Sequence, residues 1–236
     1  MPVIALGGLT AGGGRIIGPK VAQKLNIDYV DKDIIKQAAL QSGMDIELFT
    51  KKEEKPSSFS ESILQKISDI LEKSAFSGAV GDPHFGPGAA AFLTHEFEDL
   101  NSEENSEKYH LNDDDYSKGV EEAVLQLAEL GSIVIVGRGA NIILKNHPKV
   151  LRIGLIAEEK DRVNRISAFE NVNNEKAKEL MENRDKARIQ YFEKVFNIED
   201  PDSRFNYHAI LNTSSMSFEV ATDIIIDLAK DLNLDN

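Results

Sequence analysis

The chain has 236 residues, of which 41% are hydrophobic and 28% charged, a balance that supports a buried core and excludes a disordered tail. Its 40 acidic and 27 basic residues give a net charge of -13, which argues against a general binder of nucleic acid or of anionic membranes, because such a binder needs a basic face. The absence of cysteine excludes disulfides, thiolate metal sites and cysteine nucleophiles, and it fits a reducing compartment.

The apolar runs of the sequence are short. Residues 133–136 and 224–226 are typical of them, whereas a membrane-spanning helix needs roughly 20 apolar residues. No basic stretch precedes the first apolar run, so the N-terminus does not resemble a secretory signal. We therefore expect a cytoplasmic protein with small-molecule partners, without nucleic-acid or membrane partners, and the sequence leaves a homodimer open.

The first elements alternate between strand and helix. Residues 2–6 form an apolar run that ends in a glycine-rich stretch, which predicts a buried strand running into a tight loop. From Arg15 to Leu25 apolar residues recur with helical period, so a helix is expected to begin at the loop. Residues 28–30 predict a second strand, and Asp31 is suited to cap a helix that follows it.

The middle of the chain has a different composition. Residues 51–62 are polar, residues 77–93 contain four glycines and two prolines, and residues 96–115 contain nine acidic residues. We interpret residues 46–115 as an insertion with mobile parts, which includes one amphipathic helix near residues 63–71.

Alternation returns in the second half of the chain. Helices are predicted from Tyr116 to Leu130 and over residues 158–169, 174–195 and 217–232, and strands over residues 133–136, 150–156 and 209–211. Continuous apolar strands between helices favour an α/β fold with a mostly parallel sheet flanked by helices on both faces. Ligands of such sheets bind at the carboxyl ends of the strands, so the candidate site segments are residues 7–15, residues 137–141 and the start of the helix after Ile156.

One glycine motif bears on chemistry. Residues 8–13 have the G-x-x-x-x-G spacing that begins a P-loop, in which backbone amides surround a phosphate at a helix N-terminus. The next two positions hold Gly14 and Arg15, where a full P-loop has lysine and then serine or threonine. The stretch is therefore either a phosphate loop or a plain turn, and Arg15 favours the phosphate loop because a guanidinium binds phosphate with two hydrogen bonds.

Several ordered segments together resemble the cytidylate kinase-like proteins, which are relatives of bacterial cytidylate kinase with a glycine-and-arginine version of the P-loop. The similarity is strongest in AGGGRIIGPKVA (11–22), YVDKDII (29–35) and IVIVGRGA (133–140). It continues through residues 150–165, 183–185 with Arg188, and 206–214, and it fades in the insertion.

The resemblance implies a three-layer P-loop kinase fold. The core would comprise residues 1–45 and 116–236, with a lid around residues 170–200, and the insertion 46–115 would cover the acceptor. The implied reaction moves the terminal phosphate of ATP to a nucleoside monophosphate, CMP-like or another small acceptor, with Mg²⁺. The donor phosphates would be held by Thr10, Ala11, Gly12, Gly13, Gly14, Arg15 and Ile16.

The resemblance also implies roles for residues farther along the chain. Arg138, with Gly139 beside it, would face the acceptor monophosphate, and Asp31 could orient the acceptor or a metal-bound water, although a helix cap is its simpler role. Arg184 and Arg188 lie one helical turn apart and would form the lid pair. Together with Arg15 they are the candidate catalytic residues.

Some features favour other interpretations. Gly139 stands where cytidylate kinase proper has aspartate, so cytosine specificity is not supported, and a nucleotide-binding regulatory module without turnover is the second hypothesis. A structural protein with a vestigial loop is the third. Arg162 and Arg165 favour surface ion pairs because acidic residues surround them at helical spacing. No metal site within the protein is predicted, because the five histidines are scattered without helical pairing and the single acidic triplet, residues 113–115, is more typical of a helix cap.

Overall fold

The computed structural model describes residues 2–31, 65, 67 and 113–231. The chain divides into two compact units, Met1–Asp31 with Leu130–Asn236 and, separately, Lys32–Glu129. In the second unit the structure describes helix α8, Asp113–Leu130, which begins three residues before the predicted start. The helices expected after Asp31 and near residues 63–71 lie outside the described residues, apart from positions 65 and 67.

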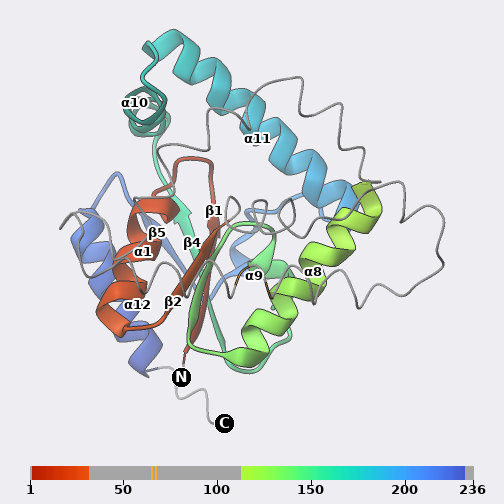
Figure 1. Cartoon of the computed structure of the whole chain (residues 1–236). Coiled ribbons are helices and arrows are strands. Elements are labelled where there is room, and N and C mark those ends of the chain that lie inside the picture. The colour runs from red at the N-terminus through yellow and green to blue at the C-terminus, as the bar shows by residue number, and fades with distance from the viewer. Residues whose placement is uncertain (1, 32–64, 66, 68–112, 232–236) are drawn as a thin grey trace. The chain divides into compact units, whose positions relative to one another are not determined.

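The first unit is built on a parallel sheet of five strands (Figure 1). All neighbouring pairs are parallel, in the order β2-β3-β1-β4-β5. The strands are β1 Val3–Gly8, β2 Asp28–Asp31, β3 Ile133–Val136, β4 Val150–Ile156 and β5 Ala209–Asn212. The predicted parallel sheet is confirmed. Because all strands are parallel, their carboxyl ends lie along the same edge of the sheet.

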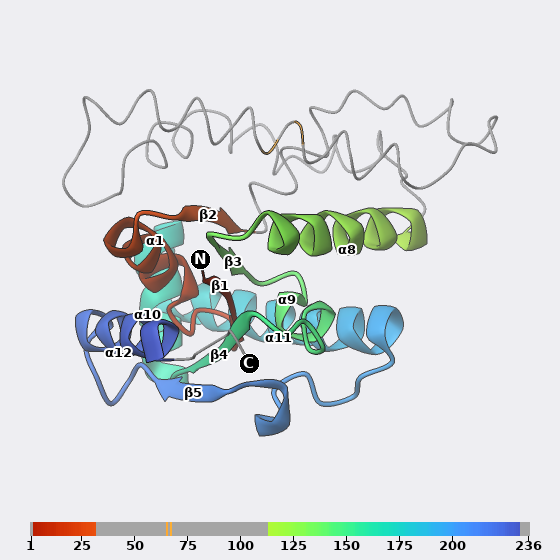
Figure 2. The ribbon, with the colours of Figure 1, turned by 90° about the horizontal axis from the view of Figure 1, so that it is seen from below.

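Helices follow these strands along the chain (Figure 2). They are α1 Gly14–Leu25, α9 Ala140–Ile143, α10 Glu159–Glu170, α11 Asn174–Phe196 and α12 Phe218–Asp231, with a 3-10 turn at Arg204–Asn206. All were predicted except α9 and the 3-10 turn, which are too short to show an apolar period. No helix in the described part of the chain has the length and apolar character needed to span a membrane.

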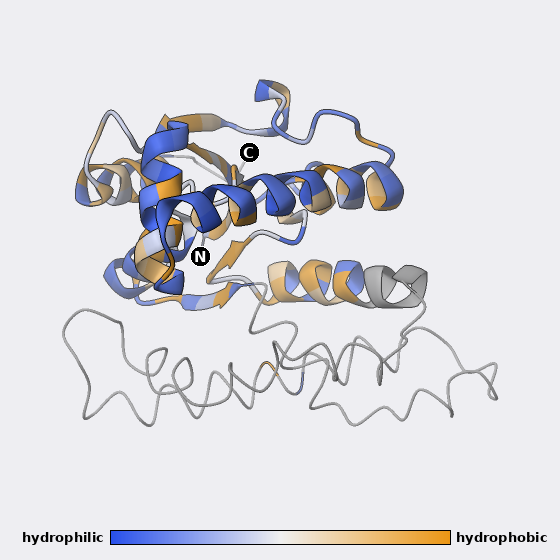
Figure 3. Ribbon diagram, turned by 90° about the horizontal axis from the view of Figure 1, so that it is seen from above, coloured by the Kyte–Doolittle hydropathy of each residue, from blue (hydrophilic) through white to orange (hydrophobic). Residues whose placement is uncertain are grey.

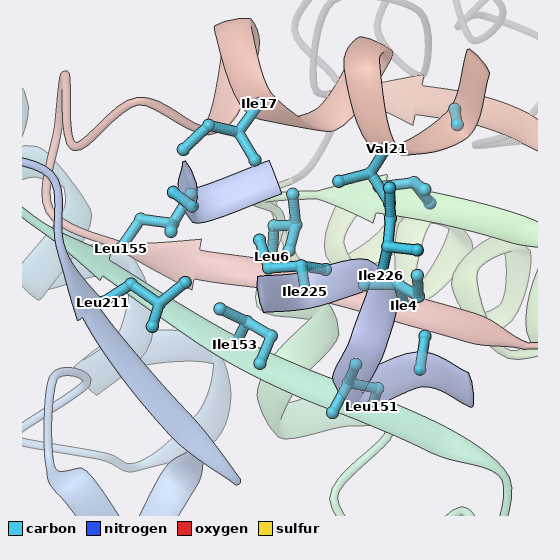
Figure 4. Close-up of a cluster of buried hydrophobic side chains, with 14 residues drawn as sticks. Ile4, Leu6, Ile17, Val21, Leu151, Ile153, Leu155, Leu211, Ile225 and Ile226 are labelled. Atoms are coloured by element: carbon cyan, nitrogen blue, oxygen red, sulfur yellow. The ribbon is translucent and has the colours of Figure 1, made fainter. Parts of the chain in front are cut away.

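The main core lies on the face of the sheet covered by α1 and α12 (Figure 4). Alternate strand residues such as Ile4 and Leu6 point to this face, because side chains alternate along a strand. They pack against Ile17 of α1 and Ile225 of α12, all fully buried. Burying each such side chain stabilises the fold by about 1.5–3 kcal/mol.

The opposite face carries α9. A Cβ placed on Gly7 of β1 would lie 3.0 Å from the Asn141 side chain of α9, and one on Gly154 of β4 would lie 3.1 Å from Tyr207. Helical segments therefore cover both faces, as the three-layer prediction requires. Helices α10 and α11 pack against each other through Val163 and Met181, among others, and expose mostly hydrophilic residues (Figure 3).

A histidine and an arginine meet where β4 and β5 run side by side. The Arg152 amide donates to His208 Nδ1 over 3.1 Å, and the Arg152 guanidinium lies 3.0 Å from Nε2 of the same ring. Burial, followed by the arginine charge, lowers the pKa of His208 below its ordinary value of 6.5. The folded protein therefore disfavours a protonated ring.

This lowered pKa predicts a pH-dependent stability. Between the folded and unfolded pKa values the unfolded chain binds more protons, so stability is fully present above 6.5 and falls as the pH drops below it. We expect the melting temperature to fall more for the parent than for His208→Gln between about pH 7.5 and about pH 5.5. Equal decreases in both proteins would show that the ring does not contribute.

Candidate functional site

Residues 8–14, here called the glycine turn, join β1 to α1 at the edge where the strands end (Figure 1). The Leu9 amide donates to the Leu155 carbonyl of β4 over 3.0 Å, and the Gly12 amide donates to the Leu9 carbonyl over 2.9 Å. The turn is therefore attached to the neighbouring strand and closed on itself.

Two positions of the glycine turn admit no side chain. A Cβ on Gly8 would lie 2.2 Å from the Leu155 carbonyl oxygen, and a Cβ on Gly12 would lie 2.4 Å from the same atom. Gly8 also has a φ of 110°, which residues with a Cβ rarely adopt. Glycine at both positions lets the turn lie directly on the end of β4.

Helix α1 begins at Gly14, directly after the turn. No side chain caps its N-terminus and no acidic residue lies in its first turn. The first amides of a helix lack carbonyl partners within it, and the helix dipole adds partial positive charge there. The segment 10–16 that was predicted to hold phosphates therefore lies at a helix N-terminus suited to an anion.

Two arginines of α10 donate hydrogen bonds to backbone carbonyls of the glycine turn. Arg162 Nε donates to the Thr10 carbonyl over 2.7 Å, and Arg165 donates to the Ala11 carbonyl over 2.9 Å. Arg165 also bonds the Thr213 hydroxyl over 2.9 Å, and that hydroxyl donates to the Gly12 carbonyl over 2.8 Å.

The interpretation of Arg162 as a surface ion-pair residue is wrong. It is 7% exposed, and it pairs with Asp185 of α11. Helical spacing identifies only neighbours on the same helix, whereas the partners of Arg162 are a loop carbonyl and a carboxylate of another helix.

Arg15 is the second residue of α1 and directly follows the glycine turn. Its guanidinium stands 5.5 Å from the centre of the Phe169 ring of α10. The Tyr29 hydroxyl donates to Asp31 over 3.0 Å. Burial, followed by Asp31, raises the pKa of Tyr29, and the nearby Arg15 charge opposes that rise. Arg15 therefore brings positive charge to the same region as the Asp31 carboxylate.

Asp31 and Arg138 lie at the carboxyl ends of two neighbouring strands. Asp31 is the last residue of β2, pairs in register with Val136 of β3 and is buried. Arg138 comes two residues after β3, is half-buried and has a φ of 54°. The structure thus brings Asp31 and Arg138 to the edge that carries the glycine turn, as the sequence predicts.

A sequence model described as the cytidylate kinase-like family matches residues 3–215. The chain belongs to this family. Membership supports a nucleotide-dependent kinase in general and does not determine the acceptor. A comparison with functionally curated proteins finds no match.

Two solved structures with low sequence identity match this chain along most of its length. An uncharacterized protein from Eubacterium ventriosum matches with a TM-score of 0.61 and 18% identity, covering 97% of this chain and 98% of that chain. Shikimate kinase from Acinetobacter baumannii in complex with shikimate matches with a TM-score of 0.47 and 14% identity, over 99% and 96% of the two chains. The first of these supports the fold alone.

Gly139 is one position where the resemblance implies another residue, an aspartate, and the structure gives a physical reason for the glycine. Gly139 has a φ of 72°, and a Cβ there would lie 2.6 Å from the Phe196 ring of α11. An aspartate at this position would be strained and would displace Phe196. The packing of the Phe196 ring against Gly139 therefore leaves no room for an aspartate side chain at this position.

The predicted lid pair lies on α11, and both arginines pair with carboxylates. Arg184 bonds Glu170 of α10 over 2.8 Å, and Arg188 pairs with Asp202, which follows α11. The two guanidiniums are therefore held in defined positions. A phosphate that recruited either one would compete with its carboxylate.

Sequence reasoning missed two polar side chains above Gly7. The side chain of Asn141 is 2% exposed, and its amide nitrogen has no hydrogen-bond partner in the structure. The Tyr207 hydroxyl donates to the Pro201 carbonyl over 3.3 Å, and burial, followed by the Asp202 charge, raises the pKa of Tyr207 to about 12. Asn141 falls within the candidate segment 137–141, but an isolated asparagine after a predicted strand carries no further signal.

Proposed function

We propose that this chain transfers the terminal phosphate of ATP to a nucleoside monophosphate or another small acceptor. The observation that carries the proposal is the glycine turn, which lies at the N-terminus of α1 with two of its carbonyls bound by the arginines of α10. Amides and cations, without a covalent nucleophile, are the groups that phosphoryl transfer requires. A cytoplasmic location and small-molecule partners belong to the same proposal.

Each cation has a proposed place. Arg15 and the amides of residues 10–16 hold the donor phosphates, and Arg138, with Gly139 beside it, holds the acceptor. Arg184 and Arg188 leave their carboxylates to stabilise the charge of the transferring phosphoryl group. This exchange is plausible chemically because a phosphate binds a guanidinium in the same two-bond geometry as a carboxylate.

The described residues fit a phosphate-bound Mg²⁺ better than a metal cage made by the protein. They include no group of three side chains able to hold a metal ion, and Arg15 replaces the usual P-loop hydroxyl. Asp31 is the carboxylate that would hold the ion, directly or through water, and the remaining ligands would be phosphates and waters. Bound Mg²⁺ would neutralise phosphate charge.

Replacing Arg15 with alanine should weaken ATP binding about tenfold. The change removes a charged donor from the first turn of α1, and one hydrogen bond to a charged group is worth about 1.5–3 kcal/mol. Titration calorimetry measures the effect, with Lys20→Ala in the same helix, where the ammonium pairs with Glu219 of α12, as a control. An unchanged affinity for ATP in Arg15→Ala would remove Arg15 from the site.

A second function, nucleotide binding without turnover, is favoured by two observations. Gly14 and Arg15 stand where a full P-loop has lysine and a hydroxyl, and both lid arginines are paired with carboxylates. In this case ATP would bind and regulate a partner, and the chain would not transfer phosphate.

A coupled phosphoryl-transfer assay separates the two functions. The full chain is incubated with Mg²⁺ and ATP against a panel of nucleoside monophosphates and their deoxy forms. Turnover with one acceptor supports the kinase and names its substrate. ATP binding without turnover across the panel favours the regulatory module.

A further inference from the structure

The guanidinium of Arg162 joins the glycine turn to the helix that carries the lid pair. Its Nε donates to the Thr10 carbonyl over 2.7 Å, and one terminal nitrogen lies 2.5 Å from Oδ2 of Asp185. Asp185 belongs to α11, where it directly follows Arg184 and precedes Arg188 by three residues. One buried cation therefore contacts both regions to which the proposed function assigns phosphate binding.

The burial of Arg162 makes this connection specific. Removing a guanidinium from water is costly unless its donors find acceptors, so a buried arginine is retained where its geometry is satisfied. Here the acceptors come from two separate parts of the chain, a loop carbonyl and a carboxylate. A lysine could reach one of them but could not reproduce the planar arrangement.

The bond to Thr10 engages a carbonyl of the glycine turn. A carbonyl oxygen that faces a phosphate repels it, whereas an amide attracts it. Arg162 and Arg165 bind the carbonyls of Thr10 and Ala11 on the α10 side of the turn. Ala11 has a φ of 57°, an unusual conformation that requires support from its surroundings.

We propose that Arg162 is a positioning residue that couples the lid helix α11 to the glycine turn through Asp185. Arg162 does not touch the nucleotide. It orients the Thr10 peptide for the phosphate chain, and Asp185 holds Arg162 in place. A displacement of α11 on nucleotide binding is therefore transmitted to the turn. This inference rests on the proposed function, because it requires a phosphate chain at the glycine turn.

The matched control uses another ion pair between the same two helices. Lys178 of α11 lies 2.6 Å from Glu159 of α10, and both side chains are exposed. This pair joins α10 to α11 without a contact to the glycine turn. Lys178→Gln therefore reports what the loss of an interhelical ion pair does by itself.

The test is a calorimetric titration of the full chain with ATP and, separately, with inorganic tripolyphosphate. We expect Arg162→Met to weaken both ligands by about tenfold, the loss that accompanies one hydrogen bond to a charged group. Asp185→Asn should weaken both by a smaller factor. The double variant should bind no more weakly than Arg162→Met, because Asp185 acts through Arg162. Lys178→Gln should stay within about twofold of the parent.

The outcomes distinguish this inference from the proposed function. If the parent binds neither ligand, the proposed function fails and the inference fails with it. If the parent binds and Arg162→Met binds equally well, only the inference is overturned. Independent losses that add in the double variant would also overturn it, because they would show that Asp185 does not act through Arg162. Should Arg162→Met not fold, Asp185→Asn and Arg162→Lys give the same comparison.

Discussion

Replacing Arg188 with alanine lowers the phosphoryl-transfer rate constant by about a hundredfold and leaves ATP affinity within about twofold. A guanidinium that meets the transferring group mainly in the transition state affects turnover more than binding, and removing one such donor costs about 10²–10³ in rate. The measurement is kcat with the acceptor that the panel identifies, together with the Kd for ATP.

The structure supplies the control for this prediction. Arg188 pairs with Asp202, and both side chains are largely buried, so its loss leaves a carboxylate without its cation. Thermal melting shows whether Arg188→Ala is folded, and Asp202→Asn removes the carboxylate while keeping the arginine. A lower kcat in Arg188→Ala with a folded protein supports the assignment. An unchanged kcat would show that Arg188 has only a structural role.

Replacing Gly12 with alanine abolishes detectable ATP binding and lowers the melting temperature. The added Cβ would lie 2.4 Å from the Leu155 carbonyl oxygen, which is a backbone atom at the end of β4 and cannot turn away as a flexible side chain could. The turn must leave β4 to relieve the contact, and overpacking of this kind costs about 1–3 kcal/mol. The turn then loses the conformation that aims its amides at an anion.

Gly137→Ala is the matched control for Gly12→Ala. Gly137 has a φ of 80°, but a Cβ there meets no atom within 4 Å. This variant therefore carries the backbone strain of a left-handed residue, about 1–2 kcal/mol, without the collision. We expect it to bind ATP like the parent. ATP binding by Gly12→Ala at the parent's affinity would contradict the proposed role of the turn.

Much of the fold is predictable from local pattern. Strand β4 occupies the predicted residues 150–156, because the run is mostly apolar, although Arg152 interrupts it. Helix α1 begins one residue before the predicted start because a glycine can occupy its first position. The four residues of α9 span only about one helical turn, which is too short for apolar residues to recur with helical period in the sequence.

The sequence predicts which residues of the candidate site lie at the ends of strands. It does not predict the side-chain contacts that join them to other elements. The glycine turn, Asp31 and Arg138 lie at the carboxyl ends of strands, and parallel strands bring these ends together. The contact of Arg162 with Thr10 and Asp185 could not be predicted, because it joins residues 152 and 23 positions apart in the sequence. The collision that excludes a side chain at Gly139 arises in the same way, from a helix that returns 57 residues later.

We propose that the glycine turn binds the phosphates of ATP although it lacks the P-loop lysine and hydroxyl. Calorimetric titration of the full chain with ATP in the presence of Mg²⁺ tests it most directly, followed by competition with tripolyphosphate. We expect one ATP to bind per chain and tripolyphosphate to displace it, because the protein recognises the phosphates. A titration without binding heat at several temperatures would contradict it and would leave the glycine turn as a connection between β1 and α1.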